Sequence, residues 1–233
     1  MSELAVARLE KGAWTPALIE EMGRLVAPIT GPDPSVLSDE LLRGDRLYLA
    51  RDAQGLAAFM LVARVRLPVG PECRHARYLG ATAVRSDAWS SGAAAALQAR
   101  VAADTQAEES RLRQRLLLFS TTATLGALCA ARTLWADVQP AQDGSFNDEL
   151  VPVAFAAAHW LGTRPEPRLP FVLQGLGAVR PRAWARCGCS AADHGRRDLD
   201  FLRRLGVDEA TGDRLLLFCS LSAVRAPSAA EAA

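Results

Sequence analysis

The sequence predicts a mixed α/β fold in which a mainly antiparallel central sheet is flanked by helices. Two observations indicate this class. Short apolar runs that are typical of strands alternate along the chain with segments whose apolar residues recur at helical spacing. Two of these apolar runs are separated by the turn sequence Asp52-Ala53-Gln54-Gly55, which favours an antiparallel hairpin.

The N-terminal part of the chain supplies a strand, two helices and the hairpin. Residues 5–9 are predicted as a short strand, and residues 35–43 as a short helix. The hairpin strands are residues 47–50 and 56–65. Between the first strand and the short helix, residues 14–26 are predicted as a helix because their apolar residues recur at helical spacing: Leu18, Ile19, Met22, Leu25 and Val26.

The middle of the chain continues with strands and helices in turn. Residues 67–72, which contain two prolines and a glycine, are predicted as a loop that ends the hairpin unit, and residues 76–84 as a further strand. A helix is expected at residues 90–107. Residues 115–119 form a short apolar run between charged and hydroxyl residues, which is typical of a buried strand. Residues 124–136 are predicted as a helix with one apolar face, formed by Leu125, Leu128, Ala131 and Trp135.

The last third of the chain has weaker patterns. Residues 139–147 are predicted as a loop, and residues 151–161 fit either a strand or a helix. Residues 163–170 hold three prolines, which are expected to exclude regular structure. Residues 198–205 are predicted as a helix ended by the glycine that follows, and residues 214–219 as the final strand.

These elements suggest a domain organisation. We expect a core at residues 1–138, a C-terminal elaboration at residues 139–225 that adds the last strand to the same domain, and a disordered tail of small residues at 226–233.

The composition excludes several classes of partner. Of the 233 residues 50% are hydrophobic and 23% are charged, a balance typical of a folded soluble protein. The formal net charge of +1 attracts neither nucleic acid nor an anionic membrane, so neither is an expected partner. No stretch has the roughly 18 uncharged apolar residues of a membrane span, and the first residues lack the order of a secretory signal. We expect a cytoplasmic protein, and its abundance of alanine and arginine, with Lys11 as the only lysine, is typical of a GC-rich bacterial genome.

The cysteines are expected to be reduced thiols. There are five of them, an odd number that argues against a closed disulfide framework in a cytoplasmic protein. Cys187 and Cys189 with His194 have the residue types of a zinc site, but a C-x-C pair and one histidine leave the usual set of four ligands incomplete. We therefore expect no metal.

The stretch Val84 to Leu97, V-R-S-D-A-W-S-S-G-A-A-A-A-L, is the most informative part of the sequence. A predicted strand ends at Val84, and a helix begins a few residues later with unusually small side chains. The unpaired N–H groups and the dipole of a helix N-terminus attract an anion, and small residues let a phosphate approach the backbone closely. A ligand that carries a pyrophosphate fits this pattern. The alternative is an alanine helix capped by serine.

Residues 84–97 resemble the signature of the GNAT superfamily of acyl-CoA-dependent N-acyltransferases. That signature reads Val-x-Pro-x-aromatic-Arg/Gln-x-x-Gly-x-Gly/Ala-x-x-Leu, between the fourth strand and the third helix. Its valine, glycine, Gly/Ala and leucine positions correspond to Val84, Gly92, Ala94 and Leu97. The chain departs from it at three positions, which hold Ser86, Ala88 and Trp89, the last in place of the Arg/Gln.

The resemblance implies a GNAT-like sheet, an acetyl-CoA or other acyl-CoA co-substrate, and a donor site built largely from backbone N–H groups. The residues implied in binding the donor are Ala83, Val84, Trp89, Ser90, Ser91, Gly92, Ala93 and Ala94. The family often ends a later helix with Ala-x-x-Leu-Tyr, whose tyrosine reprotonates the departing thiolate. Here residues 131–138 or 201–207 are similar, with Trp135 or Leu202 in place of the tyrosine.

Catalysis in such a protein would be direct attack of an amine on the thioester carbonyl, which the backbone at Ala83 and Val84 would polarise. The catalytic candidates are Ser120 and Thr121 at the end of the predicted strand 115–119, and Tyr78. Each also has a structural interpretation, the first two as a polar strand end and the tyrosine as a packed side chain.

Three functions remain open. The first is an N-acyltransferase that moves an acetyl or other acyl group from acyl-CoA to an unidentified amine acceptor. A variant uses a longer acyl chain from CoA or an acyl carrier protein, accommodated by Gly80, Ala81 and Ala83. The competing class is a non-catalytic ligand sensor or protein-binding module, favoured by Trp89 and Trp135 where relatives carry functional polar groups. The oligomeric state is open, with a homodimer as the candidate.

Overall fold

The computed structural model describes residues 4–30, 35–88, 91–122, 125–176, 193–207 and 211–221. The chain forms two compact units. Unit 1 comprises Met1–Arg66 and His75–Leu116, and unit 2 comprises Leu67–Arg74 and Leu117–Ala233. The boundary that the sequence suggests at residue 138 falls inside unit 2, and the tail at 226–233 lies outside the described residues.

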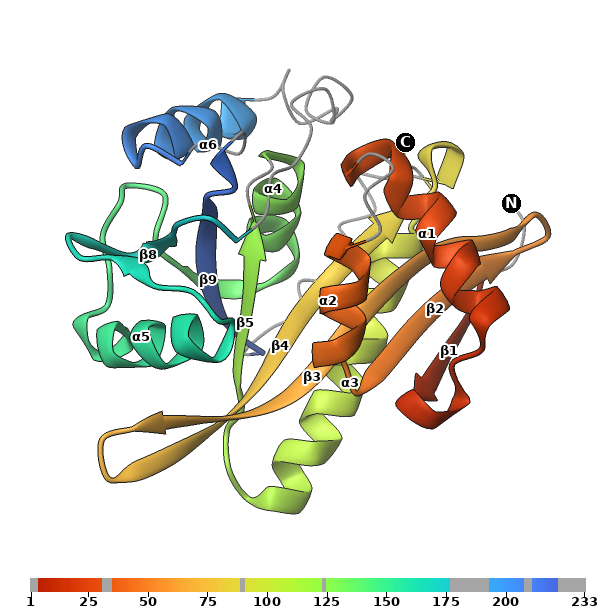
Figure 1. Cartoon of the computed structure of the whole chain (residues 1–233), viewed down its shortest axis with the longest axis horizontal. Coiled ribbons are helices and arrows are strands. Elements are labelled where there is room, and N and C mark those ends of the chain that lie inside the picture. Colours follow the sequence, from red (N-terminus) through yellow and green to blue (C-terminus); the bar gives the residue numbers. More distant parts are fainter. Residues whose placement is uncertain are drawn as a thin grey trace. The chain divides into compact units, whose positions relative to one another are not determined.

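The predicted fold class is confirmed, because both units carry antiparallel strands with helices packed beside them. The sheet of unit 1 has the order β1-β2-β3-β4 (Figure 1). Strand β1 pairs antiparallel with β2, Ala7 opposite Leu49, and β2 pairs antiparallel with β3, Tyr48 opposite Met60. The bounds of these strands are Ala5–Glu10 for β1, Arg46–Asp52 for β2, Gly55–Val69 for β3 and Glu72–Val84 for β4.

The prediction of a loop at residues 67–72 is wrong. Strand β3 runs through Pro68 to Val69 and β4 starts at Glu72, so the turn is reduced to Gly70 and Pro71. Gly70 has a φ of +62°, which a glycine adopts at no steric cost. Proline is tolerated in a strand where its missing N–H is not needed for pairing, and Pro68 is exposed.

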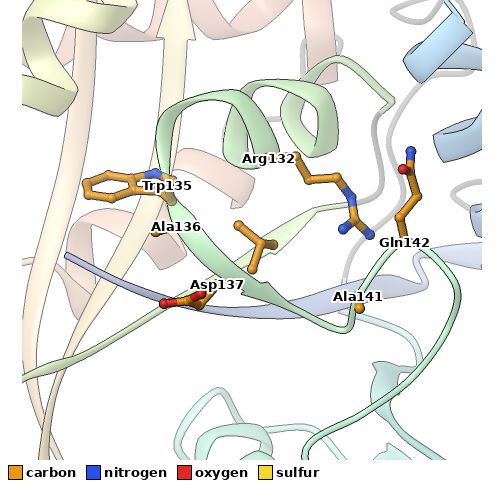
Figure 2. A pocket seen from close by; sticks show the side chains of 7 residues that line it. Arg132, Trp135, Ala136, Asp137, Ala141 and Gln142 are labelled. Carbon is orange, nitrogen blue, oxygen red and sulfur yellow. The ribbon is translucent and has the colours of Figure 1, made fainter. Parts of the chain in front are cut away.

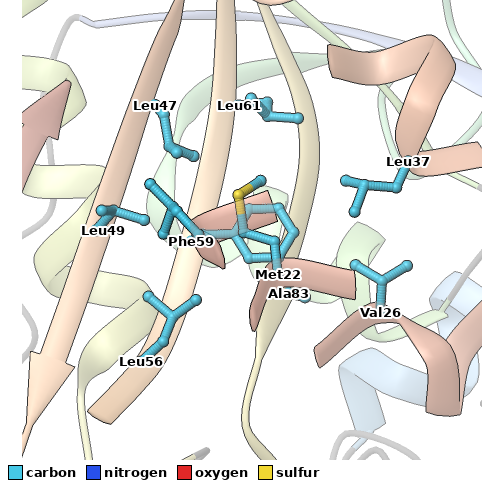
Figure 3. Packing of buried hydrophobic residues seen from close by; sticks show 10 residues of the cluster. Met22, Val26, Leu37, Leu47, Leu49, Leu56, Phe59, Leu61 and Ala83 are labelled. Carbon is cyan, nitrogen blue, oxygen red and sulfur yellow. The ribbon is translucent and has the colours of Figure 1, made fainter. Parts of the chain in front are cut away.

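Helices cover both faces of the unit 1 sheet. The bounds are Lys11–Ala13 for the 3-10 helix η1, Pro16–Thr30 for α1, Ser35–Arg43 for α2, Ser86–Ala88 for the 3-10 helix η2 and Ala93–Leu112 for α3. Met22 of α1 and Leu37 of α2 pack against Leu47, Phe59 and Leu61 of the sheet in one buried cluster (Figure 3). Because side chains alternate along a strand, the residues next to Leu47 point to the opposite face, which α3 covers.

The contact between α3 and the sheet is made by buried charges. Arg77 of β4 has a fully buried side chain and donates to Glu108 at 2.5 Å and to the Thr105 hydroxyl. Arg46 of β2 also donates to Glu108, at 2.9 Å. One carboxylate of α3 thus compensates two guanidinium groups of the sheet.

A second carboxylate of α3 extends this contact. Asp104 accepts hydrogen bonds from the Tyr48 hydroxyl at 3.0 Å and from Arg8 at 2.8 Å. Burial, together with the charge of Asp104, raises the pKa of Tyr48 to about 12, so this phenol stays protonated and remains a donor.

The only lysine of the sequence lies beside the C-terminal end of α2. The ammonium of Lys11 donates to the carbonyl of Leu42 at 2.8 Å and lies 5.8 Å from the centre of the Trp14 ring. A cation over an indole face is a favourable contact. Both contacts hold the lysine against unit 1.

In unit 2 the strands are paired in the order β5-β9-β8-β7, with β6 also paired to β9 (Figure 1). The strands are β5 (Leu117–Thr122), β6 (Ala136–Gln139), β7 (Pro165–Glu166), β8 (Leu169–Leu173) and β9 (Arg214–Ser220). The helices are α4 (Leu125–Leu134), the 3-10 helix η3 (Asp148–Leu150), α5 (Val151–Trp160) and α6 (Asp193–Arg204). Aromatic side chains form the core, with Phe119 5.9 Å from Trp160 and 6.2 Å from Phe218 between ring centres.

Two predictions for this unit are corrected or decided. Residues 151–161, which fit a strand or a helix, form helix α5 with a proline in its first turn. The prediction that residues 163–170 have no regular structure is wrong, because they contain β7 and the start of β8. Strand β7 is only two residues long and lies at the end of the strand order, where a proline need not donate to a neighbour. Strand β6 was not predicted.

Helix α6 is attached to α4 by a buried ion pair. Asp198 of α6 is 1% exposed, and its Oδ1 lies 3.0 Å from Arg132 Nε of α4 and accepts from the Gln142 amide at 3.0 Å. Cys129 donates to the other oxygen at 3.5 Å. The Arg132 guanidinium also lies 5.1 Å from the centre of the Phe201 ring.

The remaining predicted strands and helices are present, each within five residues of its predicted ends. In the described part of the chain no helix combines the length and the apolar character needed to cross a membrane. Three of the cysteines, Cys73, Cys129 and Cys219, are free thiols, and burial raises the pKa of Cys219 to about 12.

Candidate functional site

A strand, a loop and a helix N-terminus form the first part of the site in unit 1. Strand β4 ends at Val84, and α3 begins at Ala93, later than the predicted start at residue 90. Gly92 is the N-cap of α3 with φ +80° and ψ +7°, a left-handed conformation that glycine adopts without strain. Gly92 has no side chain that could cap the helix, and a Cβ added at Gly92 would meet nothing within 4 Å.

Ser91 is not the cap of α3. Its hydroxyl donates to the carbonyl of Ala88 at 2.6 Å, as does its N–H at 3.0 Å. Because Ser90 lies outside the described residues, the choice between an anion site and a helix capped by serine stays a prediction. The first-turn N–H groups of an α-helix have no partners within the helix, and the space around the Cβ position of Gly92 is open.

Most of the residues implied in donor binding lie along this segment. Ala83 is buried and Val84 half-buried at the end of β4, and Ser91, Gly92, Ala93 and Ala94 form the last part of the loop and the start of α3. Trp89 and Ser90 lie outside the described residues.

Arg85 fixes the shape of the loop. Its guanidinium lies 2.7 Å from Asp52 in the β2–β3 turn and 2.6 Å from Asp87, and its backbone N–H donates to the carbonyl of Ala57 at 2.8 Å. The hydrogen bond from Arg85 holds the pKa of Asp52 below its usual range. This arginine is therefore paired with carboxylates, and an anion at the loop would be bound by backbone groups.

A second group of polar atoms lies on the α2 side of β4. The carboxylate of Glu40 accepts from the Tyr78 hydroxyl at 3.1 Å through Oε1 and from the Ala81 N–H at 2.9 Å through Oε2. Arg43, on the next turn of α2, lies 3.4 Å from Oε1. Burial raises the pKa of the Glu40 carboxyl, while the hydrogen bonds from Ala81 and Tyr78 and the charge of Arg43 lower it in part.

The backbone of β4 is irregular where Glu40 meets it. Arg77 contacts α3 and Tyr78 contacts α2, as alternation along a strand requires. Regular alternation would send Ala81 and Ala83 to the α3 face, yet both pack with the buried cluster under α1 and α2. Strand β4 therefore has an extra residue between Tyr78 and Ala81, a β-bulge, which explains why an N–H of the strand donates to a side chain.

Gly80 makes room for the carboxylate. A Cβ built on Gly80 would lie 2.4 Å from Glu40 Oε2 and 3.0 Å from a ring carbon of Tyr78. Any side chain at this position would displace the carboxylate. The sequence suggested that the small residues of β4 leave space for an acyl chain. Beside Gly80 that space is occupied by the Glu40 carboxylate.

The catalytic candidates from the sequence are found in different units. Tyr78 is 3% exposed and belongs to the Glu40 group in unit 1. Ser120 and Thr121 lie on β5 in unit 2, opposite Leu217 and Leu216 of β9. The roles of all three residues stay predictions.

Glu40 was missed by the sequence analysis. Its partner Tyr78 is 38 positions away in the chain, so no local motif joins the two. One signal was available: Glu40 falls on the same helical stripe as Leu37 and Leu41, where an apolar residue is expected.

Unit 2 contains a cavity of about 460 Å³ at the end of α4 (Figure 2), lined by Arg132, Trp135, Ala136, Asp137, Val138, Ala141 and Gln142. Its charged groups have partners, since Arg132 pairs with Asp198 and Asp137 accepts from Ser220 at 2.9 Å. Trp135, which with Leu202 is one of two residues that the resemblance sets in place of the family's tyrosine, is 6% exposed.

Within the part of the chain that the structure describes, no three His, Cys, Asp or Glu side chains gather as metal ligands would. Cys187 and Cys189 lie outside that part, as does the side chain of His194.

No protein-family model and no curated protein matches the chain. Among solved structures, the chain is similar to a protein of Desulfovibrio desulfuricans assigned to the GNAT family of acetyltransferases, with 16% identity and a TM-score of 0.42 over 94% of this chain and 100% of that one. It is also similar to a conserved protein of Enterococcus faecalis V583 described as a probable N-acyltransferase, with 13% identity and a TM-score of 0.42 over 55% of this chain, but it spans only 32% of that protein.

A third similar structure is a mutant of the toxin AtaT, bound to acetyl-CoA and to the C-terminus of the antitoxin AtaR. It is 12% identical, with a TM-score of 0.40 over 56% of this chain and 82% of that one. All three likenesses combine sequence identities of 12–16% with TM-scores of 0.40–0.42.

Proposed function

We propose that the protein is an acyl-CoA-dependent N-acyltransferase, which moves an acetyl or other acyl group from the CoA thioester to an amine. The observation that supports this most strongly is the arrangement of Val84, Gly92 and the N-terminus of α3 in unit 1. A strand end followed by a glycine N-cap and the start of a helix, with open space at the Cβ position of Gly92, suits the pyrophosphate of CoA.

The acyl donor would be bound mainly by backbone groups. The first-turn N–H groups of α3 would donate to the pyrophosphate, and the helix dipole would add a favourable field. Arg85 would act indirectly, by fixing the loop through its pairing with Asp52 and Asp87. The backbone of Ala83 and Val84 would hydrogen-bond the pantetheine arm and the thioester.

The reaction would be a direct transfer. The lone pair of the amine forms the new C–N bond at the thioester carbonyl, the C–S bond breaks, and CoA leaves as a thiolate that takes up a proton. The nitrogen gives up one proton in the same reaction, so a neutral amine and acyl-CoA yield an amide and free CoA.

Binding of acetyl-CoA, a long-chain acyl-CoA and free CoA, measured by calorimetry, tests this function. We expect wild-type protein to bind at least one of the three, and Gly92→Glu to abolish binding, because the new carboxylate would repel the pyrophosphate. Gly144→Glu is the matched control, since Gly144 also has a positive φ, of +92°, and open space around its Cβ position. Wild-type protein that binds none of the three ligands would contradict the proposal.

The loop anchor gives a second prediction. Arg85→Gln removes the ion pairs to Asp52 and Asp87, so the loop loses its fixed shape and the dissociation constant for CoA should rise. Each exposed pair contributes about 0.2–1 kcal/mol, so we expect a change on the order of 3–10-fold. Arg24→Gln, which removes an exposed pair on α1, should leave the affinity unchanged. Equal affinity of Arg85→Gln and wild type would show that Arg85 does not fix the loop.

One observation favours a second candidate, a non-catalytic ligand-binding module. Trp135 and Leu202, the two residues that the resemblance sets in place of the tyrosine that reprotonates the thiolate, are both buried. CoA binding without transfer to any amine would support this candidate, and turnover of any amine would exclude it.

A further inference from the structure

The Glu40 carboxylate of α2 lies against β4, the strand that ends in the candidate donor loop, and neither the function nor the motif accounts for it. We propose that Glu40 accepts the proton that the amine loses during acyl transfer, with Tyr78 and Gly80 as the residues that position it. This inference rests on the proposed function.

Hydrogen bonds hold the Glu40 carboxylate in place, and part of its side chain remains exposed to solvent. Oε1 accepts from the Tyr78 hydroxyl at 3.1 Å and from Arg43 at 3.4 Å, and Oε2 accepts from the Ala81 N–H at 2.9 Å. Oε2 has a second lone pair that can take up a proton. The Glu40 side chain is 14% exposed, so an acceptor molecule can reach it from solvent.

The sequence of β4 is adapted to this carboxylate at two positions. The glycine at 80 leaves the space that Oε2 occupies, because a Cβ there would lie 2.4 Å from it. The bulge before Ala81 turns a backbone N–H toward the same oxygen. A carboxylate that only anchored α2 would not need a missing side chain and an irregular strand.

The charges around Glu40 suit a base. Of the described groups, Arg43 from its own helix and Tyr78 from β4 are the charged or titratable groups that act on it. Their effect is smaller than that of burial, which raises the carboxyl pKa. A base whose pKa lies closer to the working pH takes a proton more effectively than an ordinary surface carboxylate.

The proton balance is simple. After the amine attacks the thioester carbonyl, the nitrogen of the tetrahedral intermediate carries a proton that must leave. Glu40 takes it as the intermediate collapses, the C–S bond breaks, and the thiolate is protonated from water. Glu40 then releases its proton to water, so the carboxylate is restored for the next turnover.

The pH dependence of stability tests whether the pKa of Glu40 is raised in the folded protein. A carboxyl with a raised pKa in the folded state contributes stability that is fully present below its unfolded pKa and is lost as pH rises through the folded pKa. Glu40→Gln cannot ionise, so it does not lose stability as pH rises through the folded pKa of Glu40. The variant should therefore have a higher Tm than wild type above this pH window and no advantage below it.

Thiol release from acetyl-CoA, measured over a range of pH with a panel of primary amines, tests the catalytic role. We expect Glu40→Gln to lower kcat by about 10²–10⁴-fold and to lose the acidic limb of the kcat profile, with little change in the affinity for acetyl-CoA. Tyr78→Phe removes a donor to the charged carboxylate and should move that limb to higher pH. Gly80→Ala should lower kcat by displacing the carboxylate.

Two control variants match these changes. Asp39→Asn alters the neighbouring, exposed carboxylate of α2, and Gly23→Ala adds a Cβ that meets nothing within 4 Å. Both should keep the wild-type kcat and pH profile.

Two results would overturn the assignment. A Glu40→Gln variant that transfers acyl groups with the wild-type pH profile would show that the base is elsewhere, while the proposed function would stand. Wild-type protein that binds acetyl-CoA and transfers it to no amine would remove both the proposed function and this role.

Discussion

Replacing Glu108 by glutamine should lower the free energy of unfolding by about 3–5 kcal/mol, the cost of breaking a buried ion pair by removing one partner. Glu108 accepts from both Arg46 and Arg77, and the Arg77 side chain is fully buried. A neutral amide leaves the fully buried Arg77 guanidinium without a counter-charge, whereas Arg46 keeps Glu10 at 3.6 Å.

Denaturant unfolding at neutral pH measures this change. Glu20→Gln, which alters an exposed carboxylate, should stay within about 0.5 kcal/mol of wild type. Adding Arg77→Met to Glu108→Gln should recover part of the loss, because the buried charge is then removed. A loss below about 1 kcal/mol for Glu108→Gln would contradict the importance of this pair.

Acid should remove the stability that the Glu108 ion pairs contribute to wild-type protein. Burial raises the pKa of Glu108, but the hydrogen bond from Arg46 and the charge of Arg77 outweigh it and hold that pKa below its usual range. Stability from a lowered carboxyl pKa is present above the unfolded pKa and is lost as pH falls through the folded pKa.

Replacing Asp198 by asparagine should cost about 3 kcal/mol in unit 2, by the same reasoning. Asp198 is 1% exposed and is the counter-charge of Arg132. The asparagine oxygen can still accept from Gln142, so the expected loss lies at the lower end of the range for buried pairs.

The measurement is again denaturant unfolding, with Asp200→Asn on the exposed face of α6 as the matched control. The Cys129 thiol gives a second readout, because it donates to Asp198 and should react faster with a thiol reagent once α6 is loosened. An Asp198→Asn variant with wild-type stability and an equally protected thiol would show that the ion pair does not hold α6.

Local patterns were enough for most of the fold. The turn sequence Asp52 to Gly55 identified the hairpin, and apolar spacing identified α1 and α4, since these signals are contained within a few residues. The errors at Pro68 and at residues 163–170 have one cause. Proline was taken to end a strand, whereas a proline that need not donate to a neighbour is tolerated within one.

The candidate site was predictable only where it is continuous in sequence. The segment from Val84 to Gly92 could be recognised because strand, loop and helix follow one another. Glu40, by contrast, is brought to Tyr78 and Ala81 by the packing of α2 on the sheet. The bulge that exposes the Ala81 N–H leaves no mark in the sequence beyond a glycine and an alanine.

The single lysine has a consequence for any experiment on acyl transfer. An enzyme that acylates amines also has its own amines within reach, and here the only ε-amino group is that of Lys11, engaged with Leu42 and Trp14. Because the chain has one ε-amine and one α-amine, intact-mass spectrometry can count acyl groups added to the protein itself. Lys11→Arg removes the ε-amine and leaves only the α-amine. Lysine-rich proteins added to the reaction would be easy to identify as acceptors, because this chain has a single lysine.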